Sequence, residues 1–109
     1  MENISINEFA KVYLCVGEIL SCDVVEASSK LYKLEVDLGE HGKRQILAGV
    51  RKSFSPEDLI GKQGVYVANL DPRKILDLES QGMMLFAKDE NGLHLVTVDS
   101  KVENGTRLK

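Results

Sequence analysis

The 109-residue chain has no tryptophan, and aromatic residues make up only 6% of it, so its core must be built from aliphatic side chains. Basic residues are not in excess, because 14 lysines and arginines are set against 17 acidic residues, for a net charge of -3. This balance argues against a protein that coats nucleic acid by bulk charge, although a local basic patch is compatible with it. No apolar run approaches the roughly 20 residues of a membrane span, and no signal-peptide pattern is present, so no membrane partner is expected.

Cysteine is also scarce, with only Cys15 and Cys22 in the chain. Their spacing forms neither a Cys-x-x-Cys motif nor a disulfide framework, and two reduced thiols suit a cytoplasmic protein. Together with His41 and His94 they match no structural zinc pattern, so neither a metal nor another cofactor is expected. The chain also lacks a phosphate-binding loop, a dinucleotide fingerprint and a recognisable nucleophile–base pair, which predicts a protein that is not an enzyme.

The first part of the chain contains a short helix signal followed by a long extended segment. Ser5 and Glu8 are spaced as a capping box, which predicts a helical turn near residues 8–11. Residues 12–25 then read as one extended segment, with a bend or bulge at Gly17. The length of this segment suits a strand that coils around a barrel.

The rest of the chain contains further strand patterns and one helix signal. The helix signal covers residues 55–61, where Ser55 is a good N-cap and Pro56 occupies the first helical position. Asn91-Gly92 predicts a tight hairpin turn between two strands. The pattern of apolar residues predicts strands at residues 32–38, 44–48, 64–68, 83–87 and 93–98. The alternation is clearest in the first of these.

This order predicts an all-β fold, namely a five-stranded Greek-key barrel of the OB type. Such barrels commonly carry a helix between strands three and four, which is where this chain has its short helix, and they bind oligonucleotides across strands two and three and the neighbouring loops. The remaining strand material predicts a C-terminal β extension. Because the chain shows no linker or repeat, residues 1–109 are expected to form a single domain.

The clearest group of polar and basic residues follows the fourth strand. Asn69 ends that strand, Pro72 fixes a turn, and Arg73 and Lys74 follow at once. The guanidinium fork and the ammonium group are suited to phosphate oxygens, and the alternative is an ordinary solvated turn. Asn69 either hydrogen-bonds sugar or base edges, or holds its own loop through an Asx-turn.

A second polar group, Ser80 and Gln81, lies five residues further on, ahead of the next apolar strand. These two side chains either hydrogen-bond a ligand or cap the start of that strand. Met83 either offers a soft apolar platform for a nucleobase or is a plain strand residue, and one of Met83 and Met84 must face inward. The region therefore combines cations, polar groups and an apolar surface.

Several separated motifs share one order and spacing with a known family. They include Phe9-Ala10-Lys11-Val12, Val36-Asp37-Leu38-Gly39, Val67-Ala68-Asn69-Leu70, Pro72-Arg73-Lys74 and Glu79-Ser80-Gln81-Gly82-Met83. Through them the chain resembles the tRNA-binding domain family over about residues 4–109. That family includes a free-standing dimeric tRNA-binding protein, the C-terminal domain of methionyl-tRNA synthetase and a domain of endothelial monocyte-activating polypeptide.

The resemblance implies an OB-fold whose C-terminal extension helps to form a homodimer, and tRNA binding directed by shape and backbone. The implied tRNA-binding residues are Asn69, Arg73, Lys74, Ser80, Gln81 and Met83, with Lys30 as a weaker candidate. The chain departs from the family at Cys15 and Asp71, where a cation is common. Each of these two differences removes positive charge from the region.

The function implied by the resemblance is a non-catalytic tRNA-binding module that is accessory to, or part of, methionyl-tRNA synthetase. Its expected partners are tRNA, a second copy of the chain and an aminoacyl-tRNA synthetase. The alternative is a dimerisation or protein-interaction module, or an export-associated chaperone of the same fold, with weak or no RNA binding. The chain is either free-standing or a piece of a longer synthetase.

Overall fold

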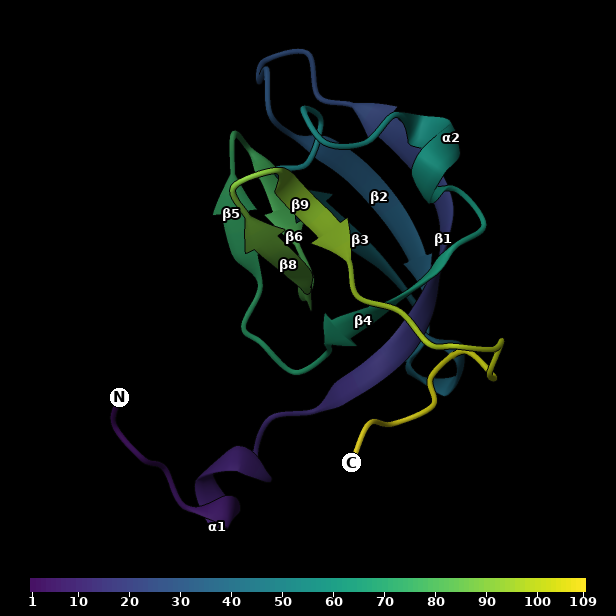
Figure 1. The fold of residues 1–109 in the computed structure, drawn as a ribbon. Coiled ribbons are helices and arrows are strands. Elements are labelled where there is room, and N and C mark those ends of the chain that lie inside the picture. The colour runs from purple at the N-terminus through teal and green to yellow at the C-terminus, as the bar shows by residue number, and fades with distance from the viewer.

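A five-stranded antiparallel sheet, curled into a nearly closed barrel, forms the centre of the computed structural model, which describes residues 1–109 (Figure 1). The strands lie in the order β3-β2-β1-β4-β7. Their bounds are Leu14–Val24 for β1, Tyr32–Asp37 for β2, Lys43–Ala48 for β3, Gln63–Val67 for β4 and Met83–Met84 for β7. This arrangement confirms the predicted all-β, OB-like barrel.

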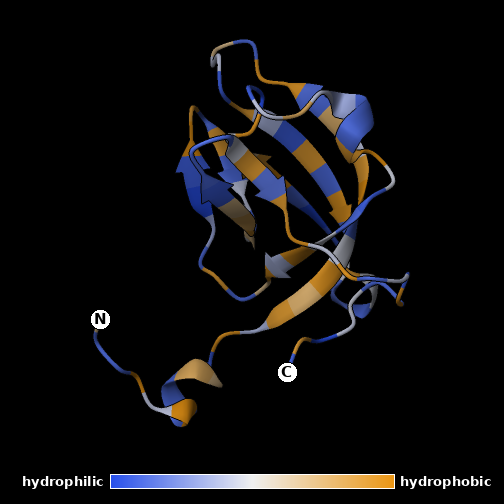
Figure 2. Cartoon of the chain, in the orientation of Figure 1, coloured by the Kyte–Doolittle hydropathy of each residue, from blue (hydrophilic) through white to orange (hydrophobic).

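The barrel core follows from the alternation of apolar and polar residues along the strands. On β2 the buried residues Tyr32, Leu34 and Val36 alternate with charged residues, and Figure 2 shows the same alternation along the ribbon. The fully buried side chains are mostly aliphatic, as the lack of aromatic residues requires, and include Ile19, Leu34, Leu38, Ile46 and Leu59. Burial of each such side chain stabilises the fold by about 1.5–3 kcal/mol.

β1 crosses the barrel and pairs with β4 over its first half and with β2 over its second half. The predicted bend or bulge at Gly17 is wrong, because the pairing runs unbroken through Gly17 opposite Gly64, and the register shift lies between Ile19 and Ser21. Gly17 is needed instead for packing. A Cβ atom there would lie 2.5 Å from Leu38 Cδ2, too close for the barrel interior to accept.

The helix between the third and fourth strands is α2 (Pro56–Leu59), as predicted. Ser55 caps it, and the Asp58 carboxylate accepts hydrogen bonds from the Ser55 backbone N and Oγ, each at 2.9 Å. These bonds hold the pKa of Asp58 below its ordinary value. The last helical residue, Leu59, is fully buried and belongs to the barrel core.

The N-terminal helix α1 (Ile6–Phe9) begins two residues before the predicted position. Ser5 is its N-cap and accepts a hydrogen bond from the Glu8 backbone N at 3.1 Å, so the helix starts immediately after the cap. A 3₁₀ turn, η1 (Gly39–His41), links β2 to β3. α1 lies apart from the barrel in Figure 1. None of the helices has the length and apolar character needed to cross a membrane.

Two short hairpins stand beside the main sheet. β8 (Phe86–Asp89) and β9 (Gly92–Leu95) form one of them, which confirms the predicted hairpin. Its two-residue loop is Glu90-Asn91 rather than the predicted Asn91-Gly92, because Gly92 pairs with Asp89 as the first residue of β9. The predicted strand 83–87 is divided between two sheets. Its first two residues form β7, which pairs with β4, and its last two residues belong to β8. The other hairpin joins β5 (Arg73–Ile75) to β6 (Leu78–Ser80), and no strand was predicted there.

The C-terminal segment returns to the barrel and occupies the edge of β1 that β2 leaves open. Gly105 N donates to Val16 O at 2.7 Å, and Val16 N donates to Thr106 O at 2.9 Å. Leu108 N then donates to Leu14 O at 2.9 Å. This β-type pairing is the predicted C-terminal extension, and it fixes the chain terminus close to the start of β1 and the N-terminal segment.

Candidate nucleic-acid interface

Arg73 and Lys74 lie on a hairpin strand rather than in the loop that the sequence indicated. β5 and β6 are connected by Leu76 and Asp77, which have positive φ angles of 49° and 66°. Two-residue hairpin turns of this kind require positive φ at both central residues and usually contain glycine, asparagine or aspartate, so leucine at the first position hides the turn. Without that signal the turn could not be read from the sequence, but the hairpin gives the two cations a fixed backbone.

The hairpin presents its two cations on opposite faces. Arg73 pairs with Ser80 and Lys74 pairs with Glu79, and successive strand residues point to opposite sides. Since the Ser80 side chain contacts β3, Arg73 is on the barrel-facing side and Lys74 on the outer side. Both cations are exposed, and neither takes part in an ion pair of the structure.

Ser80 and Gln81 have hydrogen-bond partners within the chain. Ser80 is 5% exposed, and its hydroxyl accepts from Leu47 N at 3.0 Å and donates to Gly82 O at 3.0 Å. Gln81 Oε1 accepts from Gln45 N at 2.9 Å, and Gln81 N donates to Gln45 O at 2.8 Å. These bonds join the β6–β7 segment to β3, so both side chains close the barrel and hold the hairpin against it.

The Asn69 side chain links the end of β4 to the N-terminal segment. Its Oδ1 accepts from Tyr13 N at 2.8 Å, and its Nδ2 donates to Lys11 O at 2.6 Å. These partners lie 56 and 58 residues away in sequence, so Asn69 does not form the Asx-turn within its own loop that was one of the two alternatives for it. Asn69 positions the loop that leads into the hairpin.

A groove of about 360 Å³ opens between the hairpin, β3 and β7. Its wall is mainly apolar, with a single cation and a single acid, and includes Leu47, Leu70, Asp71, Arg73, Ile75 and Met83. Met84 is buried in the barrel, whereas Met83 is 46% exposed and faces the groove. This resolves the alternative for the two methionines in favour of an outward Met83.

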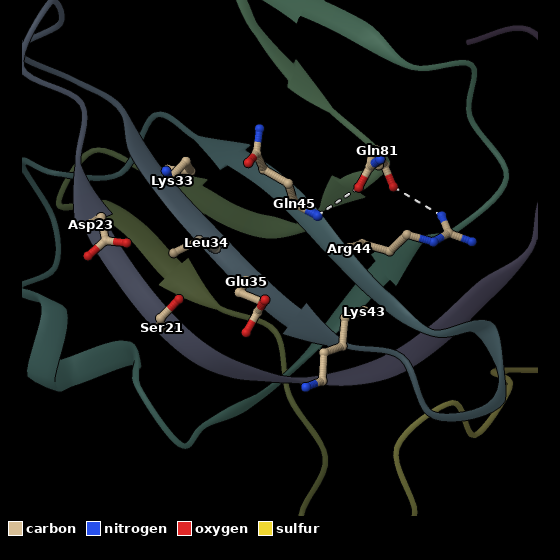
Figure 3. Close-up of a pocket in the computed structure, with 9 residues that line it drawn as sticks. All are labelled: Ser21, Asp23, Lys33, Leu34, Glu35, Lys43, Arg44, Gln45 and Gln81. Atoms are coloured by element: carbon tan, nitrogen blue, oxygen red, sulfur yellow. Dashed lines mark hydrogen bonds between the residues drawn. The ribbon is translucent and has the colours of Figure 1, made fainter.

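A second hollow, of about 400 Å³, lies on the outer face of β1, β2 and β3 (Figure 3). It is polar, and its charges alternate in sign, with Lys33 and Lys43 beside Asp23 and Glu35. Arg44 also lines it, but its Nη1 donates to Ala68 O at 2.9 Å and to Gln81 O at 3.1 Å. These residues were not predicted individually, although strand alternation and the OB-fold binding face would have identified Lys33.

Lys30 lies in the loop between β1 and β2 and lines neither hollow. Its backbone is fixed, because Lys30 N donates to Ser28 Oγ at 3.1 Å and Lys30 O accepts from Arg51 N at 3.2 Å. Its side chain is exposed. The structure therefore keeps Lys30 apart from the residues of the hairpin groove.

Burial disfavours the ionised form of three side chains of the barrel interior. Burial raises the pKa of the Cys22 thiol to about 11 and also raises the pKa of Cys15, which disfavours the reactive thiolate at both sites. Burial likewise raises the pKa of Tyr66. The structure contains no group of three histidine, cysteine, aspartate or glutamate side chains placed to bind a metal ion.

Known sequences match this chain as a part of longer proteins. A family model described as a putative tRNA binding domain matches residues 14–107. The methionine--tRNA ligase of Caldanaerobacter subterraneus subsp. tengcongensis is 46% identical over 108 residues, which is 99% of this chain and 17% of the ligase. The chain thus spans a small part of the length of this curated relative.

Solved structures match the whole barrel and its extension. The crystal structure of a MetRS-related protein from Pyrococcus horikoshii has a TM-score of 0.92 and 36% identity, covering 100% of each chain. A CsaA chaperone protein from Picrophilus torridus also has a TM-score of 0.92, with 28% identity over 98% of this chain and 100% of that chain. The alignments therefore include the β5–β6 hairpin and the C-terminal segment.

Proposed function

This chain belongs to the tRNA-binding domain family and is a non-catalytic tRNA-binding module, and we propose that residues 1–109 act as one domain that holds tRNA through the β5–β6 hairpin. The observation that carries this proposal is the state of Arg73 and Lys74. Both are exposed and free of ion pairs, on a hairpin anchored to the barrel. Free cations on a rigid support are what phosphate capture requires.

The remaining predicted residues divide into contact and support roles. Met83 and Lys30 are exposed and contribute contacts, Met83 in the groove and Lys30 at the edge of the RNA footprint. Asn69, Ser80 and Gln81 act by position, since their hydrogen bonds fix the two ends of the hairpin segment. Recognition by backbone charge and shape follows, because phosphate contacts carry no sequence information directly.

A homodimer is the second part of the proposal. Ile6, Phe9 and Val12 are 76%, 43% and 38% exposed, although all three are apolar. With Leu14 and Leu108 they line a mainly apolar cleft of about 310 Å³ between the N-terminal segment and the C-terminal tail. A second copy covering this cleft would give the dimer two hairpins, and avidity would offset weak binding at each site where one RNA contacts both.

The chain's place in translation is the third part. Its likeness to methionine--tRNA ligase supports a module that is accessory to, or part of, a methionyl-tRNA synthetase and delivers tRNA to it. Both cysteines are free thiols, which suits a location in the reducing cytoplasm. A synthetase is therefore the expected protein partner, besides a second copy of this chain.

The decisive experiment is binding of bulk tRNA at several salt concentrations. Losing two phosphate contacts in Arg73→Ala/Lys74→Ala should make the log–log salt slope shallower by about 1.4–1.8. The control is Lys62→Ala/Lys101→Ala, which removes two exposed lysines at the opposite end of β4 and should leave the slope unchanged. Absence of tRNA binding by the unaltered protein at low salt would overturn the proposal.

An unfolded-protein chaperone is the competing function, and the match to CsaA favours it. The groove beside Arg73 is apolar enough to take a peptide side chain. Co-purification from cells separates the two functions. RNA-rich eluates support tRNA binding, whereas unfolded precursor proteins without RNA support the chaperone.

A further inference from the structure

We propose that the groove beside Arg73 accepts one unpaired nucleobase, and that Asp71 at its rim selects bases that carry an amino group. This inference rests on the proposed function, because it assigns a ligand to the same RNA-binding region. It goes beyond capture of the backbone, since a base in the groove would be read by its chemistry.

The groove has the size and surface that a nucleobase needs. Its volume of about 360 Å³ lies within the usual range for small-ligand sites. Leu70 and Met83, which are 47% and 46% exposed, offer apolar surface on which a base can lie. A methionine thioether is polarisable and contacts ring edges and faces favourably. In a chain with few aromatic residues, Met83 takes the role that a stacking aromatic has in other RNA-binding modules.

The free guanidinium of Arg73 favours a nucleotide over an apolar peptide side chain. Arg73 lines the groove on the barrel-facing side of the hairpin, and its guanidinium has no carboxylate partner. With a base in the groove, Arg73 is placed for the adjoining phosphate. Lys74 extends from the opposite side of the hairpin, so an RNA strand crossing the hairpin edge meets both cations in succession.

Asp71 gives the site its selectivity. Its carboxylate is exposed, lines the groove, and forms no ion pair or hydrogen bond within the chain. A carboxylate only accepts hydrogen bonds, so beside a polyanion it is favourable only where the ligand presents donors. Adenine, cytosine and guanine each carry an amino group on the base-pairing edge, whereas uracil presents two carbonyl oxygens around one N–H. Uracil is therefore disfavoured.

The test compares labelled oligomers of adenylate, cytidylate and uridylate at low salt. The unaltered protein should bind the adenylate and cytidylate oligomers about fivefold to tenfold more tightly than the uridylate oligomer, as one solvent-exposed hydrogen bond allows. Asp71→Asn should abolish this difference, because an amide both donates and accepts. Glu79→Gln makes the same charge change on the other face of the hairpin and should shift all three affinities equally.

A second variant pair tests the apolar wall independently of charge. Met83→Ala should weaken binding of every oligomer about threefold to tenfold without changing the salt slope, and Met83→Leu should restore most of the loss. Both side chains remain apolar and lie at the surface, so the barrel is retained.

The outcomes separate this inference from the function on which it rests. Equal binding of all three oligomers, with no effect of Asp71→Asn, would overturn base selection. The salt-dependent binding of tRNA through Arg73 and Lys74 would not be affected by that result. If an apolar peptide bound in the groove and no oligonucleotide did, the inference that a nucleobase occupies the groove would be overturned. Failure to bind bulk tRNA at all would overturn the proposed function itself.

Discussion

The β5–β6 hairpin and the outer face of the barrel offer RNA two different surfaces. On the barrel face, Lys33 and Lys43 lie beside Asp23 and Glu35, and the hollow they line is almost entirely polar. The hairpin groove has fewer charges, but its arginine forms no ion pair and its wall is mainly apolar. We therefore expect a free cation next to a surface for a base to indicate the nucleic-acid site better than the number of cations does.

The largest expected effect comes from removing two cations from the hairpin, compared with removing two cations from the barrel face. Arg73→Ala/Lys74→Ala should weaken tRNA binding roughly 30-fold near 0.1 M salt, because each lost phosphate contact costs about fivefold to eightfold. Lys33→Ala/Lys43→Ala should cost less than about threefold, since neighbouring acids offset these lysines. Fluorescence anisotropy with bulk tRNA measures both. An equal or larger loss of tRNA affinity in Lys33→Ala/Lys43→Ala would place the main binding surface on the barrel face instead.

The next effect concerns the anchor that holds the hairpin against β3. Ser80→Ala leaves the Leu47 backbone N without its partner in a partly buried site, which should lower the free energy of unfolding by about 1–3 kcal/mol. Urea denaturation measures this change. Ser28→Ala, which removes a half-buried hydroxyl with only local backbone partners, is the control and should cost less than about 1 kcal/mol. A neutral Ser80→Ala would show that the hairpin does not depend on this bond.

A smaller effect is expected at the hairpin turn. Leucine is strained at a φ of 49°, where asparagine is tolerated, so Leu76→Asn should stabilise the protein by about 0.5–1 kcal/mol. Leu76 is 53% exposed, so little packing is lost. The thermal midpoint should rise while the salt slope of tRNA binding stays the same. A lower midpoint would mean that Leu76 packs against a surface that its strained backbone supports.

The smallest effect is a change in acid stability far from the groove. The folded protein holds the pKa of Asp58 below its ordinary value, so the stabilisation is present above the unfolded pKa and is lost as the pH falls through the folded value. Asp58→Asn should therefore lower stability slightly at neutral pH and flatten the acid limb of the stability profile below about pH 4. Denaturation at several pH values measures this change in stability. An unchanged acid limb in Asp58→Asn would show that Asp58 does not contribute to the acid dependence.

Local patterns predicted much of the fold. The alternation at residues 32–38 gave β2, the Ser55-Pro56 start gave α2, and Asn91-Gly92 gave the β8–β9 hairpin. In each case the physical cause lies within a few neighbouring residues. The β5–β6 hairpin was missed because Leu76, at the first central position of the turn, is not a residue type that favours a positive φ.

The candidate site was predictable in its residues but not in their roles. Arg73 and Lys74 stand out in the sequence, yet their placement on opposite faces depends on a strand that was not foreseen. Asn69 and Ser80 bond to segments 58 and 33 residues away, and such distant pairings leave no local signal. Their hydrogen-bonding capacity was evident, but the partners that use it were not.

The most direct test of the account is a map of backbone amide chemical shifts during titration with bulk tRNA. If the hairpin holds the RNA, the largest perturbations will cluster in residues 69–83, with smaller ones on β2 and β3. Perturbations concentrated on the outer face of β1, β2 and β3, with residues 69–83 unaffected, would contradict it.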